Sequence, residues 1–123
     1  MTTAQQQELR GLIKMLKLNN PEKKRSAAIK ISKSYKKHPH ALEAVKEELL
    51  SKYSSRDLNH QEVDALGWMC NVLGASGKSE FLPVLKTVTD GAINRKVKAF
   101  AQKNAEKLGG WKYDPSTHSA DWD

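Results

Sequence analysis

The sequence has a single cysteine, few aromatic residues and no long apolar run, and each shortage excludes a class of protein. Cys70 cannot form a disulfide within the chain. Because it lies in an apolar stretch with helical spacing, we expect a packed thiol rather than a nucleophile. No apolar run approaches the roughly 18 residues of a membrane-spanning helix, and the first eight residues do not resemble a secretory signal. We therefore expect a cytoplasmic protein that spans no membrane.

Motifs for catalysis and for metal or phosphate binding are also missing. His38, His40 and His60 flank the starts of predicted helices, but no cysteine or carboxylate has the spacing of a supporting metal ligand. The segment 74–79 ends in Gly-Lys-Ser like a phosphate-binding loop, yet it lacks the first glycine and the preceding strand of such loops. The sequence therefore predicts neither an enzyme nor a bound metal or cofactor.

What the sequence does contain is positive charge, and this charge is clustered. The formal net charge is +7 and the sequence pI is about 9.5. Residues 10–37 carry ten lysine or arginine residues and one acidic residue, whereas 38–90 carry eight acidic and five basic residues. Residues 91–112 are basic again. Two basic clusters predict an anionic macromolecular partner, although a solvated surface that keeps the protein soluble explains the same charge equally well.

Apolar residues three and four positions apart, with turn residues between the segments, predict six amphipathic helices. Asn20-Pro21 is typical of a helix start, because proline suits the first helical position after an asparagine N-cap. Gly109-Gly110 is typical of a helix end. The expected helices cover about 3–18, 21–37, 39–53, 60–73, 81–89 and 92–108. No segment alternates apolar and polar residues, so no sheet is expected.

The helices repeat in pairs at intervals of roughly 33–40 residues. Each pair buries only one side of itself, so three pairs must stack to form a continuous core. We expect one domain over 1–110, followed by an irregular tail over 111–123. The first helices of the three pairs share one apolar spacing: Leu9, Leu12 and Leu16; then Leu42, Val45 and Leu49; then Phe81, Val84 and Val88. The second helices share another: Ala28 and Tyr35; then Leu66 and Leu73; then Ala101 and Leu108.

Three passages of the sequence carry a family resemblance. The first consists of residues 12–17, Asn20-Pro21-Glu22 and residues 25–28; the second is residues 65–74; the third is residues 81–85 together with Asp90. They resemble the Leu-Pro-x-Leu first helix, the Asp or Asn turn and the Arg-x-Ala-Ala second helix of HEAT-type repeats. The middle unit departs from this pattern, with a longer connector. Tetratricopeptide repeats have a similar period, but their Trp, Leu-Gly and Tyr pattern is missing. The resemblance covers 5–108 and implies an all-α, right-handed α-solenoid of about three HEAT-like hairpins.

HEAT-type proteins usually bind through the ridge that their second helices form, and the resemblance points to the same surface here. Aligning the second helices places Lys30, Trp68 and Lys103 in one row. A second row, seven residues earlier, contains Gln61 between Lys23 and Lys96. The alternative for Trp68 is burial against a neighbouring helix. The predicted partner-binding residues are Lys23, Lys30, Lys33, Lys37, Trp68, Lys96 and Lys103.

The tail changes composition sharply and contains two tryptophans and one tyrosine. We favour packing of Trp111 and Tyr113 on the last helix pair, because the ends of a solenoid need covering. Trp122, between Asp121 and Asp123, is the candidate for a short docking peptide, on this chain or elsewhere.

The resemblance and the charge together predict a non-enzymatic adaptor that binds a protein with an acidic surface. The alternative is nucleic-acid binding through the backbone, without sequence preference, which the pI and the basic clusters favour. The excess of lysine over arginine and the acidic middle argue against it. An enzyme is the third reading, because some glycosylases and bilin lyases are HEAT-like. Asp64, one turn before Trp68, would be its only carboxylate–aromatic pair.

Overall fold

Six α-helices make up most of the computed structural model, which describes residues 1–109. The helices are α1 (Thr3–Lys17), α2 (Pro21–Ser34), α3 (Pro39–Lys52), α4 (His60–Ala75), α5 (Leu82–Gly91) and α6 (Arg95–Lys107), with a short 3-10 turn, η1 (Ser79–Phe81), before α5. The described part of the chain contains no strand. The all-α fold with six helices is therefore confirmed.

Asparagine caps start all three second helices of the pairs, α2, α4 and α6. The side chains of Asn20, Asn59 and Asn94 each accept a hydrogen bond from a backbone N–H in the first turn that follows. Such a cap satisfies an N–H that has no partner within the helix. Pro21 then stands at the first position of α2, where its missing N–H has no cost. Local sequence thus sets where each second helix begins.

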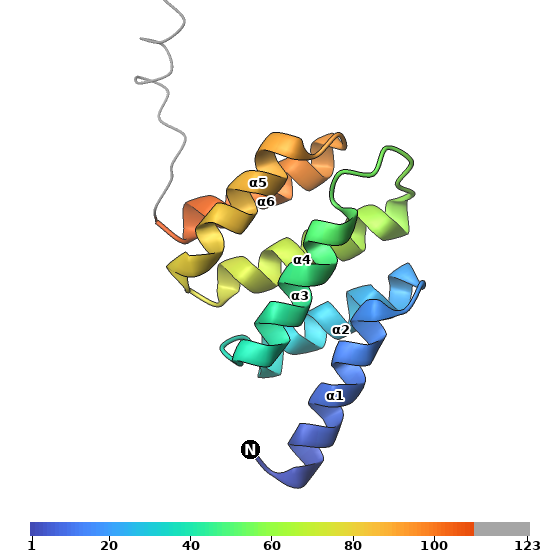
Figure 1. Cartoon of the computed structure of the whole chain (residues 1–123), viewed down its shortest axis with the longest axis vertical. Coiled ribbons are helices and arrows are strands. Elements are labelled where there is room, and N and C mark those ends of the chain that lie inside the picture. The colour runs from blue at the N-terminus through green and yellow to red at the C-terminus, as the bar shows by residue number, and fades with distance from the viewer. Residues whose placement is uncertain (110–123) are drawn as a thin grey trace, which may run out of the picture.

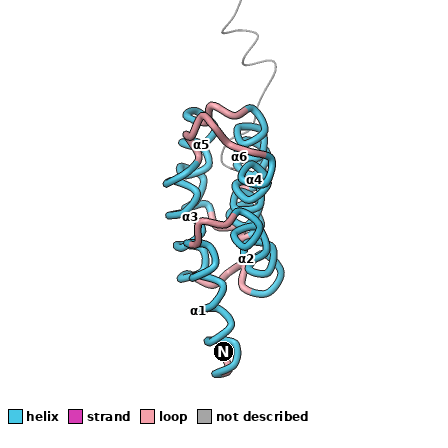
Figure 2. The backbone as a smooth tube through the Cα atoms, turned by 90° about the vertical axis from the view of Figure 1, so that its right-hand side faces the viewer, coloured by secondary structure: helices cyan, strands magenta, loops and turns pink. Residues whose placement is uncertain are grey.

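The helices form two layers, with α1, α3 and α5 in one and α2, α4 and α6 in the other (Figure 2). Within the second layer α4 packs against both α2 and α6, and within the first layer α1 packs against α3. The three second helices run in the same direction, so their C-terminal ends lie along one edge of the stack (Figure 1). The arrangement is three helical hairpins, each packed on the next.

The core lies between the two layers and consists of the apolar faces of all six helices. The repeated apolar positions read from the sequence are buried, except that Val84 and Leu108 are only partly buried. Cys70 is fully buried, which confirms the packed thiol, and burial raises its pKa to about 12. Within residues 1–109, no helix has the length and apolarity that crossing a bilayer requires.

The end of α2 differs from the expected position. The sequence predicts a helix to about Lys37, but α2 ends at Ser34, and Tyr35 leaves the helical conformation with φ −134°. Pro39 disfavours helical conformation at the residue before it, and His38 is accordingly extended. The chain therefore turns between Tyr35 and His38, and the Tyr35 hydroxyl donates to Glu8 Oε1 at 2.5 Å, which ties this turn to α1.

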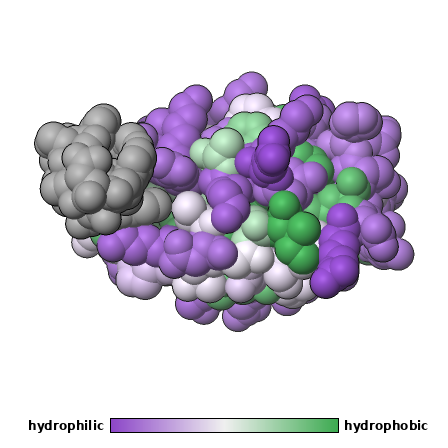
Figure 3. Space-filling model, turned by 90° about the horizontal axis from the view of Figure 1, so that it is seen from above, coloured by the Kyte–Doolittle hydropathy of each residue, from purple (hydrophilic) through white to green (hydrophobic). Residues whose placement is uncertain are grey.

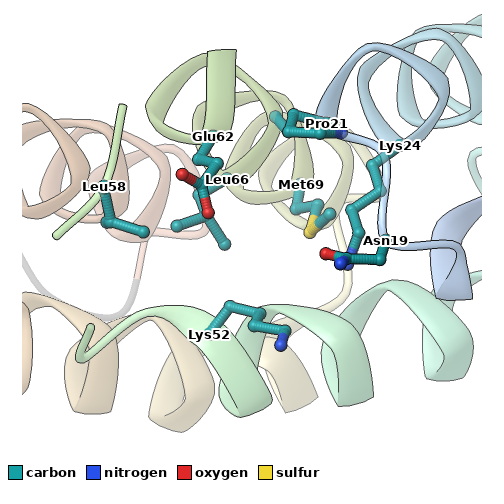
Figure 4. Close-up of a pocket in the computed structure, with 9 residues that line it drawn as sticks. Asn19, Pro21, Lys24, Lys52, Leu58, Glu62, Leu66 and Met69 are labelled. Atoms are coloured by element: carbon teal, nitrogen blue, oxygen red, sulfur yellow. The ribbon is translucent and has the colours of Figure 1, made fainter. Parts of the chain in front are cut away.

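A buried ion pair joins the first two hairpins. Lys24 of α2 pairs with Glu48 of α3, and both side chains are almost fully buried. Lys24 also lines a small cavity of about 50 Å³ between α2, α3 and α4 (Figure 4). On the same cavity, Glu62 uses its carboxylate to accept from the Asn59 N–H. The Lys24–Glu48 pair therefore helps to hold the first two hairpins together, and Glu62 completes the cap of α4.

Candidate functional site

One stripe of α4 faces solvent, while the residues between its members are buried except for the partly buried Glu62. Its members are spaced three and four apart, and they are Gln61, Asp64, Trp68, Asn71 and Ala75. Trp68 and Asn71 are partly exposed and the other three are exposed. The stripe lies on the side of α4 that faces away from the first-helix layer, and it contains no lysine or arginine. We call this stripe, together with the matching stripes of α2 and α6, the second-helix face.

The matching stripe of α2 is basic. Lys23, Lys30 and Lys33 are exposed at spacings of seven and three, with Ser26 between them, and the opposite side of α2 is buried. Within residues 1–109, none of these three ammonium groups has a hydrogen-bond or ion-pair partner. Their charge is therefore available to an external ligand.

The matching stripe of α6 is also basic. Lys96 and Lys103 are exposed seven residues apart, with Ala99 between them, while Val97 and Ala101 on the inner side are buried. The described chain offers no partner to either ammonium group. The second-helix face thus has a basic stripe at each side and an uncharged aromatic residue on the helix between them.

Two side-chain contacts relate the levels of α2, α4 and α6 to one another. Gln61 Nε2 of α4 donates to Glu22 Oε1 of α2 at 2.9 Å, so the first turns of the two helices lie at the same level. Asn104 Nδ2 of α6 donates to Asn71 Oδ1 of α4 at 2.8 Å. Counting along each helix from these contacts at about 1.5 Å per residue places Lys30, Trp68 and Lys103 level to within one turn.

The sequence left exposure and burial as alternatives for Trp68, and the structure combines the two. It packs against the core with part of its surface and remains partly exposed with the rest. The residue before it, Gly67, lets α6 approach closely, because a Cβ at this position would lie 2.7 Å from the ring of Phe100. Phe100 is itself partly exposed beside the same junction. The apolar spacing in the sequence did not indicate that the Phe100 ring would lie beside this junction.

Lys37 does not belong to the α2 stripe, because α2 ends three residues before it. Its ammonium group instead donates to the backbone oxygen of Ser76, at the end of α4, at 3.4 Å. Lys36 is exposed in the same turn. We call Lys33, Lys36, Lys37 and Lys78 the C-terminal lysine cluster, because all four lie near the C-terminal ends of α2 and α4.

His38 adds no positive charge to this edge at neutral pH. Burial lowers its pKa, and the neighbouring His40 lowers it further. The two imidazole rings lie 5.7 Å apart, and within the described residues His38 Nδ1 is buried without a hydrogen-bond partner. Residues 1–109 contain no group of three potential metal ligands, so the geometry around this pair supports no metal site.

Asp64, the carboxylate of the enzyme reading, and the cavity beside Lys24 are separate features of the structure. Asp64 is exposed on the surface of α4, outside the cavity beside Lys24. That cavity has room for a few water molecules, whereas two open hollows of about 590 and 330 Å³ lie on the surface beside Met1 and His38. The surface seen from the α5–α6 end is largely hydrophilic, with apolar side chains scattered through it (Figure 3).

Sequence reasoning missed Lys24 as a structural residue. The signal was present, because Lys24 stands three and four residues before Ala27 and Ala28 on the buried side of α2.

Trp122 and the other tail residues lie outside the described residues. Comparison of the chain with family models, with curated proteins and with solved structures finds no match. The function is therefore argued from the second-helix face itself.

Proposed function

We propose that this protein is a non-enzymatic, HEAT-like binding module that engages an acidic surface of a partner protein through the second-helix face. One observation carries the proposal: unpaired lysines of α2 and α6 lie on both sides of the partly exposed Trp68. The contact residues would be Lys23, Lys30, Lys33, Trp68, Lys96 and Lys103.

The dimensions of this face suit a protein surface. Packed helices lie about 8–10 Å apart, so the stripes of α2 and α6 are separated by about 16–20 Å. A partner would present carboxylates at that separation and an apolar side chain between them. Tryptophan is among the residues that most often dominate binding energy, and complementary charge accelerates association. Trp68 would therefore supply affinity, and the lysines would supply rate and selectivity.

Nucleic acid is the second candidate, because the same lysines could contact phosphates. The composition of α4 opposes it: His60–Ala75 contains no lysine or arginine and exposes Asp64 in the middle of the face. A phosphate backbone crossing from α2 to α6 would pass this carboxylate. A protein partner can instead place a neutral group there.

Affinity capture with the full chain tests the proposal. Lys30→Glu/Lys33→Glu should lose the protein partner that the wild type captures. Lys14→Glu/Lys17→Glu is the matched control, because both lysines are exposed in the last turn of α1 and the change in net charge is the same. Loss of nuclease-sensitive material in place of a protein would support the second candidate. Equal loss in both variants, or no loss in either, would remove the second-helix face from the argument.

A titration with defined ligands sharpens this result. A synthetic peptide of alternating glutamate and tryptophan should bind the wild type and weaken with added salt, and a DNA duplex of equal charge should bind less tightly. The reverse order of affinity would favour nucleic acid. Salt dependence alone does not distinguish the two, because both ligands are anionic.

A further inference from the structure

We propose that the chain's own segment 110–123 binds the second-helix face and competes there with the external partner. This inference rests on the proposed function, because it assigns a regulator to the same surface. Its occupant is a segment of the same chain, and binding to a second copy is a separate outcome of the test below.

The chemistry of the segment is complementary to the face. Residues 110–123 contain three aspartates, one lysine, two tryptophans and one tyrosine. Asp121 and Asp123 stand on either side of Trp122, so the end of the segment combines an aromatic ring with carboxylates. The segment thus has the acidic and aromatic character that the proposed function requires of a partner.

The position of the segment allows this contact. The helix α6 belongs to the second-helix layer and ends at the same edge as α2 and α4 (Figure 1). Gly109 follows with φ 76°, a left-handed conformation that ends a helix and turns the chain away from its axis. The described part of the chain therefore ends in the second-helix layer, at the edge where α2 and α4 also end.

The segment is long enough to cross the face. Two helix spacings of about 8–10 Å separate α6 from α2. At about 3.3–3.6 Å per residue, the 14 residues 110–123 span at most about 46–50 Å when extended. They can therefore pass the end of α4, run beside the C-terminal lysine cluster, and bring Trp122 back onto the face.

Tethering makes a weak contact effective. A segment joined through a short flexible linker experiences an effective concentration in the millimolar range. A contact with a dissociation constant of about 0.1 mM would then be about 90% formed at 1 mM effective concentration. An external ligand would bind about tenfold more weakly than it binds the open face.

Paramagnetic broadening in the full chain tests where the segment lies. Ser119→Cys provides a single site for a nitroxide label, because Cys70 is fully buried and its thiol is not reactive. We expect the amide signals of Lys30, Trp68 and Lys103 to broaden, and those of Glu47 and Lys14 in the first-helix layer to remain sharp. Broadening confined to the end of α6, or spread equally over both layers, would overturn the proposal.

A variant and a mixed sample complete the test. Asp121→Asn/Trp122→Ala/Asp123→Asn, labelled at the same position, should lose the broadening at Lys30 and Trp68. When nitroxide-labelled chain without ¹⁵N is mixed with ¹⁵N-labelled chain that carries no nitroxide, the amide signals of the ¹⁵N-labelled chain should remain sharp. Broadening in the mixture would show that the segment binds a second copy and would overturn the assignment to the same chain.

The same variant separates this inference from the proposed function. It should bind the glutamate–tryptophan peptide about tenfold more tightly than the wild type does. If neither protein binds the peptide, the proposed function fails even when the broadening pattern is present. If both bind it equally and the broadening is absent, the competing segment fails and the proposed function stands.

Discussion

Asn104 of α6 donates a hydrogen bond from Nδ2 to Asn71 Oδ1 of α4 at 2.8 Å, and a second to the backbone oxygen of Phe100 at 2.8 Å. The Asn104 side chain is fully buried and lies against Gly74, which has no side chain to displace it. This contact joins the second hairpin to the third and sets the level of α6 against α4. The second-helix face depends on it, because a shift of α6 would move Lys103 out of the row with Trp68.

Gly74→Ala should therefore destabilise the fold. The added Cβ would overlap the Asn104 side chain in a closely packed region, and overpacking of this kind costs about 1–3 kcal/mol. The free energy of unfolding in urea measures the effect. Gly11→Ala is the control: no atom lies within 4 Å of the added Cβ, so this change should stabilise α1 by about 0.5–1 kcal/mol. An equal response at both glycines would contradict the close packing of α4 and α6.

Glu48→Ala should destabilise the protein strongly, because it leaves the buried ammonium of Lys24 without its partner. Removing one member of a buried pair costs about 3–5 kcal/mol. The double change Lys24→Met/Glu48→Leu should recover most of that loss, since two apolar groups then fill the site. In contrast, Glu43→Ala at the exposed pair with Lys46 should change stability little. Thermal unfolding of the four proteins makes the comparison.

His38 should make the fold sensitive to acid. Burial lowers its pKa below the ordinary value, about 6.5, so the unfolded chain binds a proton more readily than the folded chain. The free energy of unfolding is therefore at its full value above about pH 6.5 and decreases as the pH drops below that value. His38→Asn should reduce this slope and also add the missing side-chain cap to α3, worth about 1 kcal/mol. A slope unchanged between pH 7 and 5 would assign the acid response to other groups.

Lys30→Glu/Lys103→Glu should weaken binding of the glutamate–tryptophan peptide by about tenfold or more, with little change in stability. The reason is that one charge is reversed on each side of Trp68, which opposes the ligand at both ends of the row. Titration by fluorescence anisotropy measures the affinity. Lys14→Glu/Lys17→Glu, with the same change in charge on α1, should stay within about twofold.

Cys70 should react with a thiol reagent only when the protein unfolds. Its side chain is fully buried and its pKa is raised to about 12, so the reactive thiolate is both rare and inaccessible near pH 8. The native chain should show a slow reaction that accelerates in step with urea-induced unfolding. Rapid labelling of the native protein would contradict the packing of α4.

The sequence was most informative where a feature is local. Asn20 and Pro21 predicted the start of α2, and the apolar periods predicted which sides of the helices are buried. Contacts that join distant parts of the chain had no such signal. Its spacing from Ala27 and Ala28 places Lys24 on the buried side of α2, but nothing in the sequence identifies Glu48 as its partner. Likewise, nothing pairs Asn71 with Asn104 two helices later. The end of α2 was misplaced by three residues, although Pro39 is a local signal against helix at the residue before it. The contact of Tyr35 with Glu8 of α1 had no signal in the sequence.

The candidate face was predictable for the same reason as the helices. An exposed lysine on a stripe opposite a buried one follows from helical period alone, and this holds for Lys30 and Lys103. The exposure of Trp68 did not follow, because an aromatic residue fits a core and a surface equally well. Its half-buried position reflects the close approach of α6 at Gly67, which only the packed structure reveals.

The common direction of α2, α4 and α6 also gives the second-helix face an electrical direction. Each helix carries about half a positive charge at its start and half a negative charge at its end. Lys23 and Lys96 reinforce the positive ends, whereas the C-terminal lysine cluster offsets the negative ends. Glu22 and Glu62 in the first turns of α2 and α4 oppose the positive ends, whereas the four lysines of the cluster exceed the partial negative charges at the other ends. The most negative part of a flexible acidic ligand should therefore settle over the C-terminal ends of α2 and α4.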